Sequence, residues 1–577
     1  MLQDVKKILP FIVIAATLAI AIALAAGTYY INYWPTDSYT PYTSTATRLL
    51  TKPFFSQMHE IPSDGVLRLT MHGKEALVVA IAVMQRILGD LKSLFPNVLV
   101  LIIAMAVSAI ALYFILKELF DPWIGFIGYL LFGFCFWPYL YILQGAHQPL
   151  ALMNLMLALA CLLYDRGRSN VYFLSGLFLG AMFFSSPTAT LFFAYYTGAF
   201  FYKVFGARSG RLKGRTLLLN IALLLAGMAC IFLVFTIPDP ANNIKGFLRF
   251  LRFSQSGNNF VLYKNYLQYL GFAMPSELRG GGLLWIWKYF LLIMPVMFPL
   301  YLAGNLVLLF RARRDPRWLL IILLGLSSPL AVEVSRVAQF GRNYYPWMIG
   351  MLLVIASALF VIRGYWETAR PRWKTAGCLL LIIALSGHVI FNVRTFLADV
   401  FPARMATTRV HDWLIAHGQD SVYVYYQHPR NINFTWFLNN PKSKKKIELI
   451  PIRNIREALH GYILVPPITG KSILQECRLP DFSSDTYLTE LYYAGKLDRY
   501  AAAAFPSLAS SKIWTQEEEI CTYLDLIQRG ISAEDRRKGQ VFLLDADKLQ
   551  NEWFIHFPKV LRLQYPETGN DRPWEAP

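Results

Sequence analysis

Basic residues in this chain gather in the connections between long apolar segments, and they do so on every second connection. Three clusters stand out, at residues 203–215, 311–317 and 363–374, and each follows a separate apolar run. Lys and Arg are retained on the cytoplasmic side of polytopic membrane proteins, so this alternation is typical of a chain that crosses a bilayer repeatedly. The pattern therefore restricts the fold to a helical membrane protein and indicates which connections face outside.

Apolar segments long enough to cross a hydrocarbon core of about 30 Å recur along the first four hundred residues. Composition agrees, since 55% of the residues are hydrophobic and only 16% are charged. We predict an all-α polytopic domain of about 11 transmembrane helices. Their starts are expected near Ile8, Pro96, Trp123, Pro149, Val171, Ala189, Leu217, Leu284, Leu319, Tyr345 and Thr375.

The orientation follows from placing the basic N-terminus in the cytoplasm, because this also places Lys117, Arg166, Arg168 and the three clusters there. An odd number of spans then puts the end of the chain outside. We expect a transmembrane domain at 1–398, with external loops at about 29–95 and 238–282, and an extracytoplasmic domain at 399–577. The first run could instead be a signal peptide, since residues 23–25 resemble a cleavage site, but its length favours a retained helix.

The formal net charge of +19 has a topological origin. From residue 400 onward the chain holds 22 Lys and Arg against 21 Asp and Glu, a balance of +1, which leaves 33 against 15, or +18, for the membrane part. The excess follows the orientation rule, and no nucleic-acid partner is expected. Cys477 and Cys521 lie in the external part, where a disulfide is chemically permitted, and whether they pair stays open.

The segment after residue 399 has the composition of a globular domain. We predict a helix at about 404–417, strands at 421–426, 447–451 and 461–465, a helical stretch near 431–438, and a mainly helical remainder, which together make a small α/β domain. It contains no G-x-G-x-x-G, P-loop or G-x-S-x-G motif. A domain that covers the membrane part or contacts a partner is favoured over a second enzyme.

Asp37 lies in the first external loop, shortly after the first helix, within the aromatic segment 32–42. A carboxylate at the mouth of a helix bundle, partly desolvated among aromatic side chains, is suited to work as a general base. The alternative is a turn or capping residue beside Pro35 and Ser38. The same loop offers Glu60 or Asp64 as a second carboxylate.

The second half of that loop carries His59 and His72, which are candidates for contacts with an acceptor or within the loop. Residues 76–88 follow with apolar residues at helical spacing. About thirteen residues are too few to span a bilayer, so this stretch predicts a helix that lies in the interface. The charged residues next to this helix are then expected to face water unless they have another role.

Arg336 and Arg342 bracket a short external loop just before a late span. Arginine on the translocated side opposes the orientation rule, and its planar fork of donors matches phosphate oxygens. Phosphate binding is favoured over structural pairing with Glu333. Arg279 and Lys264 in the preceding external loop are further candidates of the same kind.

Taken together, these features resemble the GT-C membrane glycosyltransferases, the superfamily of lipid A aminoarabinose transferases and protein O-mannosyltransferases. The likeness covers about the first 400 residues and lies in the position of Asp37, in His72-Gly73 ahead of a helix ending Ile87-Leu88-Gly89, in residues 112–129 and 176–186, and in the segment Gly341-Arg-Asn-Tyr-Tyr-Pro346. The chain departs from the family at Ser38, where several relatives have a second acid, and in the loop 144–148, which contains no acid.

The resemblance implies an integral membrane enzyme, of the bacterial inner (plasma) membrane and cell envelope, that moves a sugar from a polyprenyl-phosphate donor to a glycan, lipid or protein acceptor on the outer face. It assigns Asp37 as the base, with inversion at the anomeric carbon, and Arg336, Arg342 and Arg279 to the donor phosphate. No cofactor is firmly implied. The sugar, the acceptor, the need for a divalent metal and the oligomeric state are not readable from the sequence.

Two other classes of function compete with a transferase. A transporter or flippase requires ionisable residues and broken helices near the membrane midplane, and the spans here contain few charges, with Glu333 as the main exception. A noncatalytic scaffold with a degenerate GT-C fold would keep the topology and lose the chemistry. Transfer activity that depends on Asp37 distinguishes these alternatives.

Overall fold

The fold was analysed in a computed structural model. It describes residues 2–28, 42–43, 46–47, 49–50, 75–91, 94–143, 145–186, 189–206, 214–236, 290–291, 293–312, 318, 321, 325, 347–368, 370–400, 406–425, 447–452, 455–465, 496–506 and 540–549. The described residues fall into two compact units, a helical unit that ends before residue 403 and a smaller α/β unit that follows it.

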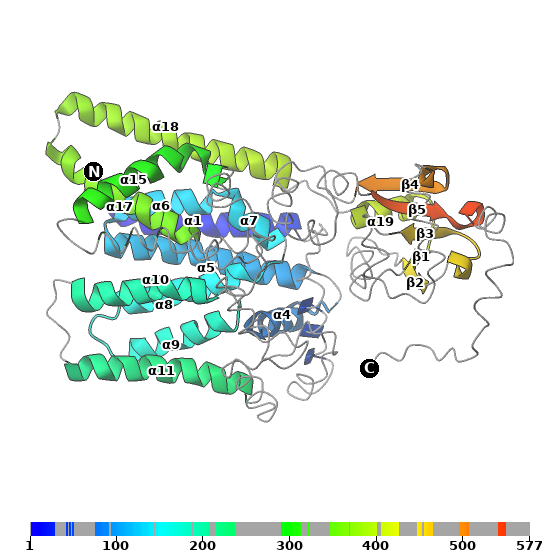
Figure 1. The fold of residues 1–577 in the computed structure, drawn as a ribbon, viewed down its shortest axis with the longest axis horizontal. Coiled ribbons are helices and arrows are strands. Elements are labelled where there is room, and N and C mark those ends of the chain that lie inside the picture. Colours follow the sequence, from blue (N-terminus) through cyan, green and yellow to red (C-terminus); the bar gives the residue numbers. More distant parts are fainter. Residues whose placement is uncertain are drawn as a thin grey trace, which may run out of the picture. The chain divides into compact units, whose positions relative to one another are not determined.

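The helical unit consists mainly of apolar helices (Figure 1). Its α-helices are α1 (Leu2–Thr28), α4 (Glu75–Leu88), α5 (Phe95–Leu119), α6 (Pro122–Gly133), α7 (Phe136–Leu143), α8 (Gln148–Leu163), α9 (Asn170–Phe183), α10 (Ala189–Phe201), α11 (Gly214–Thr236), α15 (Phe298–Ala312), α17 (Trp347–Thr368) and α18 (Pro371–Thr395). The 3-10 turn η3 (Pro295–Met297) precedes α15, and the π-helical turns η1 (Tyr202–Gly206) and η5 (Phe396–Val400) end α10 and α18.

The described helices include several that suit a bilayer. Five are long and apolar enough to cross a membrane, in α1, α5, α11, α17 and α18, and the bent pair α6 and α7 makes a sixth if it is counted as one span. The helices α8, α9 and α15 are apolar but shorter. The expected count of about 11 stays a prediction, because the span expected near Leu319 lies largely outside the described residues.

Large apolar side chains are exposed along the outer surface of this unit. Phe11 and Ile22 on α1, Leu218 on α11 and Leu380 on α18 each expose between 68% and 72% of their side-chain surface. Water would penalise such a surface, whereas lipid chains are as apolar as these side chains. The helical unit is therefore that of an integral membrane protein.

Basic residues meet at one end of the helical unit, which we call the basic end. Lys203 at the end of α10 pairs with Asp165 after α8, and Arg363 on α17 pairs with Asp121 at the start of α6. Arg311 at the end of α15 lies 5.4 Å from the ring centre of Tyr365 on α17. Connections that the sequence assigns to one side of a membrane thus lie together in space.

The α/β unit contains one five-stranded mixed sheet in the order β2-β1-β3-β5-β4. Its strands are β1 (Ser421–Tyr425), β2 (Glu448–Ile452), β3 (Tyr462–Val465), β4 (Ala501–Pro506) and β5 (Gln540–Asp545), with the helix α19 (Ala406–Ala416) and the 3-10 turns η7 (Ile455–Glu457) and η8 (Leu497–Arg499). The strands β2, β1 and β3 run parallel, and β5 pairs antiparallel with β3 and β4.

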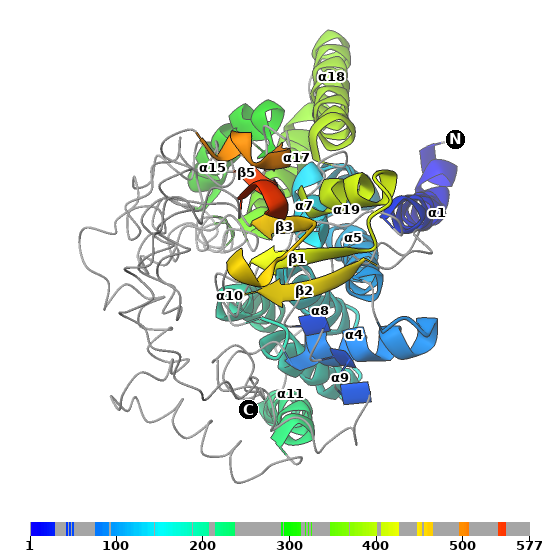
Figure 2. The same ribbon diagram turned by 90° about the vertical axis from the view of Figure 1, so that its right-hand side faces the viewer.

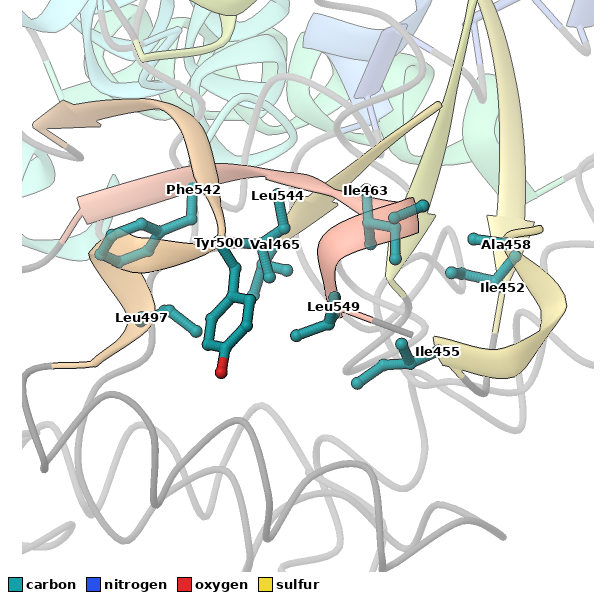
Figure 3. Packing of buried hydrophobic residues seen from close by; sticks show 11 residues of the cluster. Ile452, Ile455, Ala458, Ile463, Val465, Leu497, Tyr500, Phe542, Leu544 and Leu549 are labelled. Carbon is teal, nitrogen blue, oxygen red and sulfur yellow. The ribbon is translucent and has the colours of Figure 1, made fainter. Parts of the chain in front are cut away.

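Both faces of this sheet are covered by apolar packing. On β3, Leu464 faces a cluster formed with Val410 and Leu414 of α19, and Figure 2 shows α19 lying along the strands. Its neighbours Ile463 and Val465 face the other cluster, which is shown in Figure 3. Because successive side chains of a strand point to opposite faces, a strand that is apolar at every position is buried on both sides.

The strands β4 and β5 correct the prediction of a mainly helical remainder after residue 465. Residues 501–504 are four alanines, which have the highest helix propensity. In the structure they pair antiparallel with β5, and Phe505 packs into the cluster beneath α19. Strand pairing and burial therefore decide the conformation here over local propensity. The helical stretch predicted near 431–438 lies outside the described residues.

Candidate functional site

The site residues predicted from the sequence all lie outside the described residues. They are Asp37, Glu60, Asp64, Arg279, Arg336, Arg342, His59, His72 and Lys264, and Glu333, Cys477 and Cys521 lie outside as well. Their roles stay predictions. The described residues instead contain a group of polar side chains at the end of the helical unit opposite the basic end, which we call the polar end.

The polar end is lined by a set of nearly or fully buried polar side chains. No member of this set exposes more than 5% of its surface. The set, called the polar layer below, comprises Glu75, Asn97, His147, Gln148, Asn154, Ser185 and Ser186. Polar groups are expensive to bury in a membrane bundle and mark functional sites by default.

The start of α4 meets the end of α9 within this layer. The backbone N–H of Ala76 donates a hydrogen bond of 2.8 Å to the carbonyl oxygen of Phe184. This contact places Glu75, the first residue of α4, beside the segment that carries Ser185 and Ser186. A carboxylate in the first turn also interacts favourably with the helix dipole. The short helix predicted at 76–88 is present, and it packs against α5.

Asn154 connects α8 to the same segment. Its amide nitrogen donates to the hydroxyl of Ser185 and to the carbonyl oxygen of Leu150, each over 3.1 Å. The hydroxyl of Ser185 in turn donates to the carbonyl oxygen of Ala181 over 2.6 Å. This part of the layer is therefore internally hydrogen-bonded and fixed in position.

Asn97 and Gln148 differ from Asn154 in this respect. Both side chains are fully buried, and neither amide has a hydrogen-bond partner among the residues that the structure describes. Asn97 lies in the first turn of α5, and Gln148 is the first residue of α8. The two helices pack against each other and run in the same direction, since one bent span, α6 with α7, separates them in the chain.

The described residues nearest to Asp37 in the sequence lie at the polar end. Before it, Thr28 ends α1 and is buried, and after it Tyr42 and Thr43 are buried as well. The amide of Gln85 on α4 donates to the hydroxyl of Thr47 over 3.0 Å, which ties the segment 42–50 to α4. Thr28 at the end of α1 and Thr47 beside α4, which lie on either side of Asp37 in the sequence, are thus both packed in the helical unit.

The start of α17 also faces the polar end. Arg363 lies in the second half of α17 and pairs with Asp121 at the start of α6. This pair lies at the basic end. Trp347 at the other end of α17 therefore lies toward the polar end, where α7 finishes. Arg342 precedes Trp347 by five residues in the sequence. The described residues nearest in sequence to Asp37 and to Arg342 accordingly lie at the same end of the helical unit.

A shallow apolar groove lies between α1, α5 and α6, partway along the bundle. Its polar groups are already paired: the Thr17 hydroxyl contacts Val13 and Tyr129, and the Tyr139 hydroxyl donates to the carbonyl oxygen of Gly133. A sugar or phosphate needs polar partners, which this lining does not offer. The polar layer is therefore the better candidate for chemistry.

The polar layer combines two carboxylate oxygens, two amides without partners, an imidazole and two hydroxyls. Such a set hydrogen-bonds a polyhydroxyl ligand and orients it. Among the described residues, no three His, Cys, Asp or Glu side chains gather closely enough to hold a metal ion.

Sequence reasoning missed Asn97, Gln148 and Asn154 as candidate site residues. The signal was present, because all three are amide residues within apolar runs and two of them, Asn97 and Gln148, stand next to a proline.

Comparisons with known proteins were made at the levels of sequence and structure. No protein-family model and no curated protein matches the chain. The fold is similar to the archaeal oligosaccharyltransferase AglB from Archaeoglobus fulgidus, in complex with an inhibitory peptide and a dolichol-phosphate, with 12% identity and a TM-score of 0.48. That match covers 78% of this chain and 69% of the AglB chain.

A second similar structure is ArnT from Cupriavidus metallidurans bound to undecaprenyl phosphate, with 12% identity and a TM-score of 0.46. The match covers 85% of this chain and 95% of ArnT. AglB and ArnT are GT-C superfamily membrane glycosyltransferases, the superfamily that the sequence resembles. Identities this low, with TM-scores below 0.5, assign no activity or substrate to this chain.

Proposed function

We propose that this protein is an integral membrane glycosyltransferase that moves a sugar from a polyprenyl-phosphate donor to an acceptor hydroxyl on the extracytoplasmic face. The observation that carries the proposal is the polar layer, in which side chains from α4, α5, the start of α8 and the turn after α9 are buried at one end of a largely apolar bundle. A bundle that only spans the membrane gains nothing from this layer, because each buried polar group costs free energy unless it is paired.

The orientation supports an outer-face reaction. The basic end corresponds to the cytoplasmic side by the charge rule, so the polar end faces outside. A donor whose sugar is carried on a lipid needs no nucleotide-sugar site, and a sugar on such a lipid reaches the polar end from within the membrane. The proposal gives this chain a donor of the same class as the dolichol-phosphate and undecaprenyl phosphate in the AglB and ArnT structures.

The proposed reaction is a single displacement. Asp37 takes the proton of the acceptor hydroxyl, and the oxygen forms a bond to the anomeric carbon while the bond from that carbon to the phosphate oxygen breaks. The electron pair leaves with the polyprenyl phosphate, and the anomeric configuration inverts. Arg336 and Arg342, with Arg279, stabilise the charge that grows on the phosphate, which is the electrostatic part of the catalysis.

The proposal is tested by incubating the purified chain in detergent with a panel of radiolabelled polyprenyl-phosphate sugars and measuring sugar release to acceptor or water. Asp37→Asn is expected to keep the fold and lower transfer by at least about 100-fold. Arg342→Ala is expected mainly to weaken donor binding. Asp412→Asn, at an exposed carboxylate of α19, is the matched control and should retain full activity.

Two outcomes would contradict the proposal. Transfer that survives in Asp37→Asn would remove the assignment of the base. Neither transfer nor donor binding across the panel would instead favour the noncatalytic scaffold with a degenerate GT-C fold.

A further inference from the structure

We propose that Asn97 and Gln148 form a subsite that binds hydroxyl groups of the sugar carried by the lipid donor. This inference rests on the function proposed above. It adds that the polar layer binds the sugar of the donor. It starts from two side chains that are buried and have no partner among the described residues.

Among the buried amide side chains that the structure describes, only Asn97 and Gln148 lack a partner at both amide atoms. Asn154, in the same layer, satisfies its amide nitrogen with Leu150 and Ser185, and Asn392 on α18 is bonded through both amide atoms. The helical unit therefore does provide partners for buried amides. Both heteroatoms of Asn97 and both of Gln148 stay unsatisfied, which indicates a place that a ligand completes.

Both amides lie at helix starts, where backbone N–H groups have no partner within the helix. Leu94 and His147, the residues that cap α5 and α8, make no side-chain capping hydrogen bond, and each helix has a proline in its first two positions. The two amides therefore lie in the first turns of two helices that pack against each other and run in the same direction.

The chemistry of these groups selects a neutral, hydroxyl-bearing ligand. A side-chain amide offers two N–H donors and a carbonyl acceptor, so a ligand that satisfies it must both donate and accept. A phosphate at neutral pH mainly accepts, and it would meet the buried carboxylate of Glu75 in the same layer. A sugar hydroxyl both donates and accepts. The phosphate of the donor is accordingly left to the predicted arginines.

The test compares binding of undecaprenyl phosphate with binding of undecaprenyl phosphate that carries mannose, glucose, N-acetylglucosamine or arabinose, using the full chain in detergent. The wild type should prefer at least one lipid that carries a sugar. The double variant Asn97→Leu with Gln148→Met keeps the number of side-chain heavy atoms and removes the amide donors and acceptors. It should lose roughly tenfold or more of that preference and bind undecaprenyl phosphate unchanged.

Ser108→Ala on α5 is the matched control. Ser108 is as buried as the two amides, but its hydroxyl already donates to the carbonyl oxygen of Ala104 over 2.7 Å within the helix. This variant should keep the preference for the sugar. Equal binding of all the lipids by the wild type, or a preference that survives in the double variant, would overturn the subsite and leave the proposed function intact. A wild type that binds none of the lipids would contradict the proposed function itself.

Thermal unfolding without ligand gives a second readout. Removing unsatisfied amides from a buried layer should raise the melting temperature of the double variant by about one to a few degrees. A site kept for a ligand commonly lowers the stability of the empty protein in this way. A lower melting temperature would mean that the amides are bonded within the fold, and it would overturn the subsite.

Discussion

The amide oxygen of Asn392 accepts a hydrogen bond from the backbone N–H of Phe136, with 3.1 Å between the two atoms. Phe136 is the first residue of α7, just after the 44° bend that separates α6 from α7. One turn earlier on α18, Nε2 of His388 lies 3.1 Å from the carbonyl oxygen of Leu131, before the bend. Asn392 and His388 on α18 therefore contact two backbone groups, the N–H of Phe136 and the carbonyl oxygen of Leu131, that the bend between α6 and α7 leaves without partners in the helix.

The first prediction concerns this bridge. Asn392→Leu keeps the side-chain volume but leaves the N–H of Phe136 without its acceptor, so we expect a loss of roughly 1–3 kcal/mol in the free energy of unfolding. Unfolding in detergent, followed by denaturant or temperature, measures it. Thr375→Val on the same helix is the control, because the hydroxyl of Thr375 is exposed and its loss should change stability by less than about 0.5 kcal/mol. Equal stability of the two variants would contradict the bridge.

The second prediction concerns the contact between α9 and α11. A Cβ atom placed on Gly227 would lie 2.2 Å from the carbonyl oxygen of Phe173, and one on Gly176 would lie 2.1 Å from that of Leu224. Gly227→Ala should therefore push the helices apart and cost about 1–3 kcal/mol. Gly364→Ala on α17 meets nothing within 4 Å and should be neutral or stabilising by up to about 1 kcal/mol. If both variants melt at the same temperature, the close contact does not exist.

The third prediction concerns the link between α6 and α17 at the basic end. The carboxylate of Asp121 accepts from the N–H groups of Trp123 and Ile124, over 2.7 and 3.2 Å, and it also pairs with Arg363. Asp121→Asn keeps the helix cap and loses the ion pair, whereas Asp121→Ala loses both and should cost about 1 kcal/mol more. A double-mutant cycle with Arg363→Met should give a coupling of at least about 0.5 kcal/mol. Additive effects would show that the two side chains do not interact.

Local signals in the sequence predicted much of the helical unit. Hydropathy placed the starts of α5, α6, α8, α9, α10, α11, α17 and α18 to within about four residues, whereas α1 begins six residues before the expected Ile8 and α15 begins well after the expected Leu284. Apolar spacing placed the helix at 76–88, which the structure has at Glu75–Leu88. The charge rule grouped connections that do lie together, as the pair of Lys203 and Asp165 shows. These features depend on neighbours in the sequence, so a single chain reveals them.

Features that depend on distant residues were not predicted. The contact of Asn392 with Phe136 joins positions 256 apart in the sequence, and neither residue carries a local signal for it. The missing partners of Asn97 and Gln148 become visible only once α5 and α8 are packed in the helical unit. The alanines of β4 favour a helix locally and form a strand because β5 pairs with them. The roles of Asp37 and the external arginines stay predictions.

The anomeric configuration of the product tests the central claim most directly. NMR of the glycoside formed from a polyprenyl-phosphate sugar of known configuration should show inversion, because a single displacement with Asp37 as base places the acceptor opposite the leaving phosphate. Retention would contradict the account, since it requires a covalent sugar intermediate on the protein. A sugar that never leaves its lipid would contradict it as well.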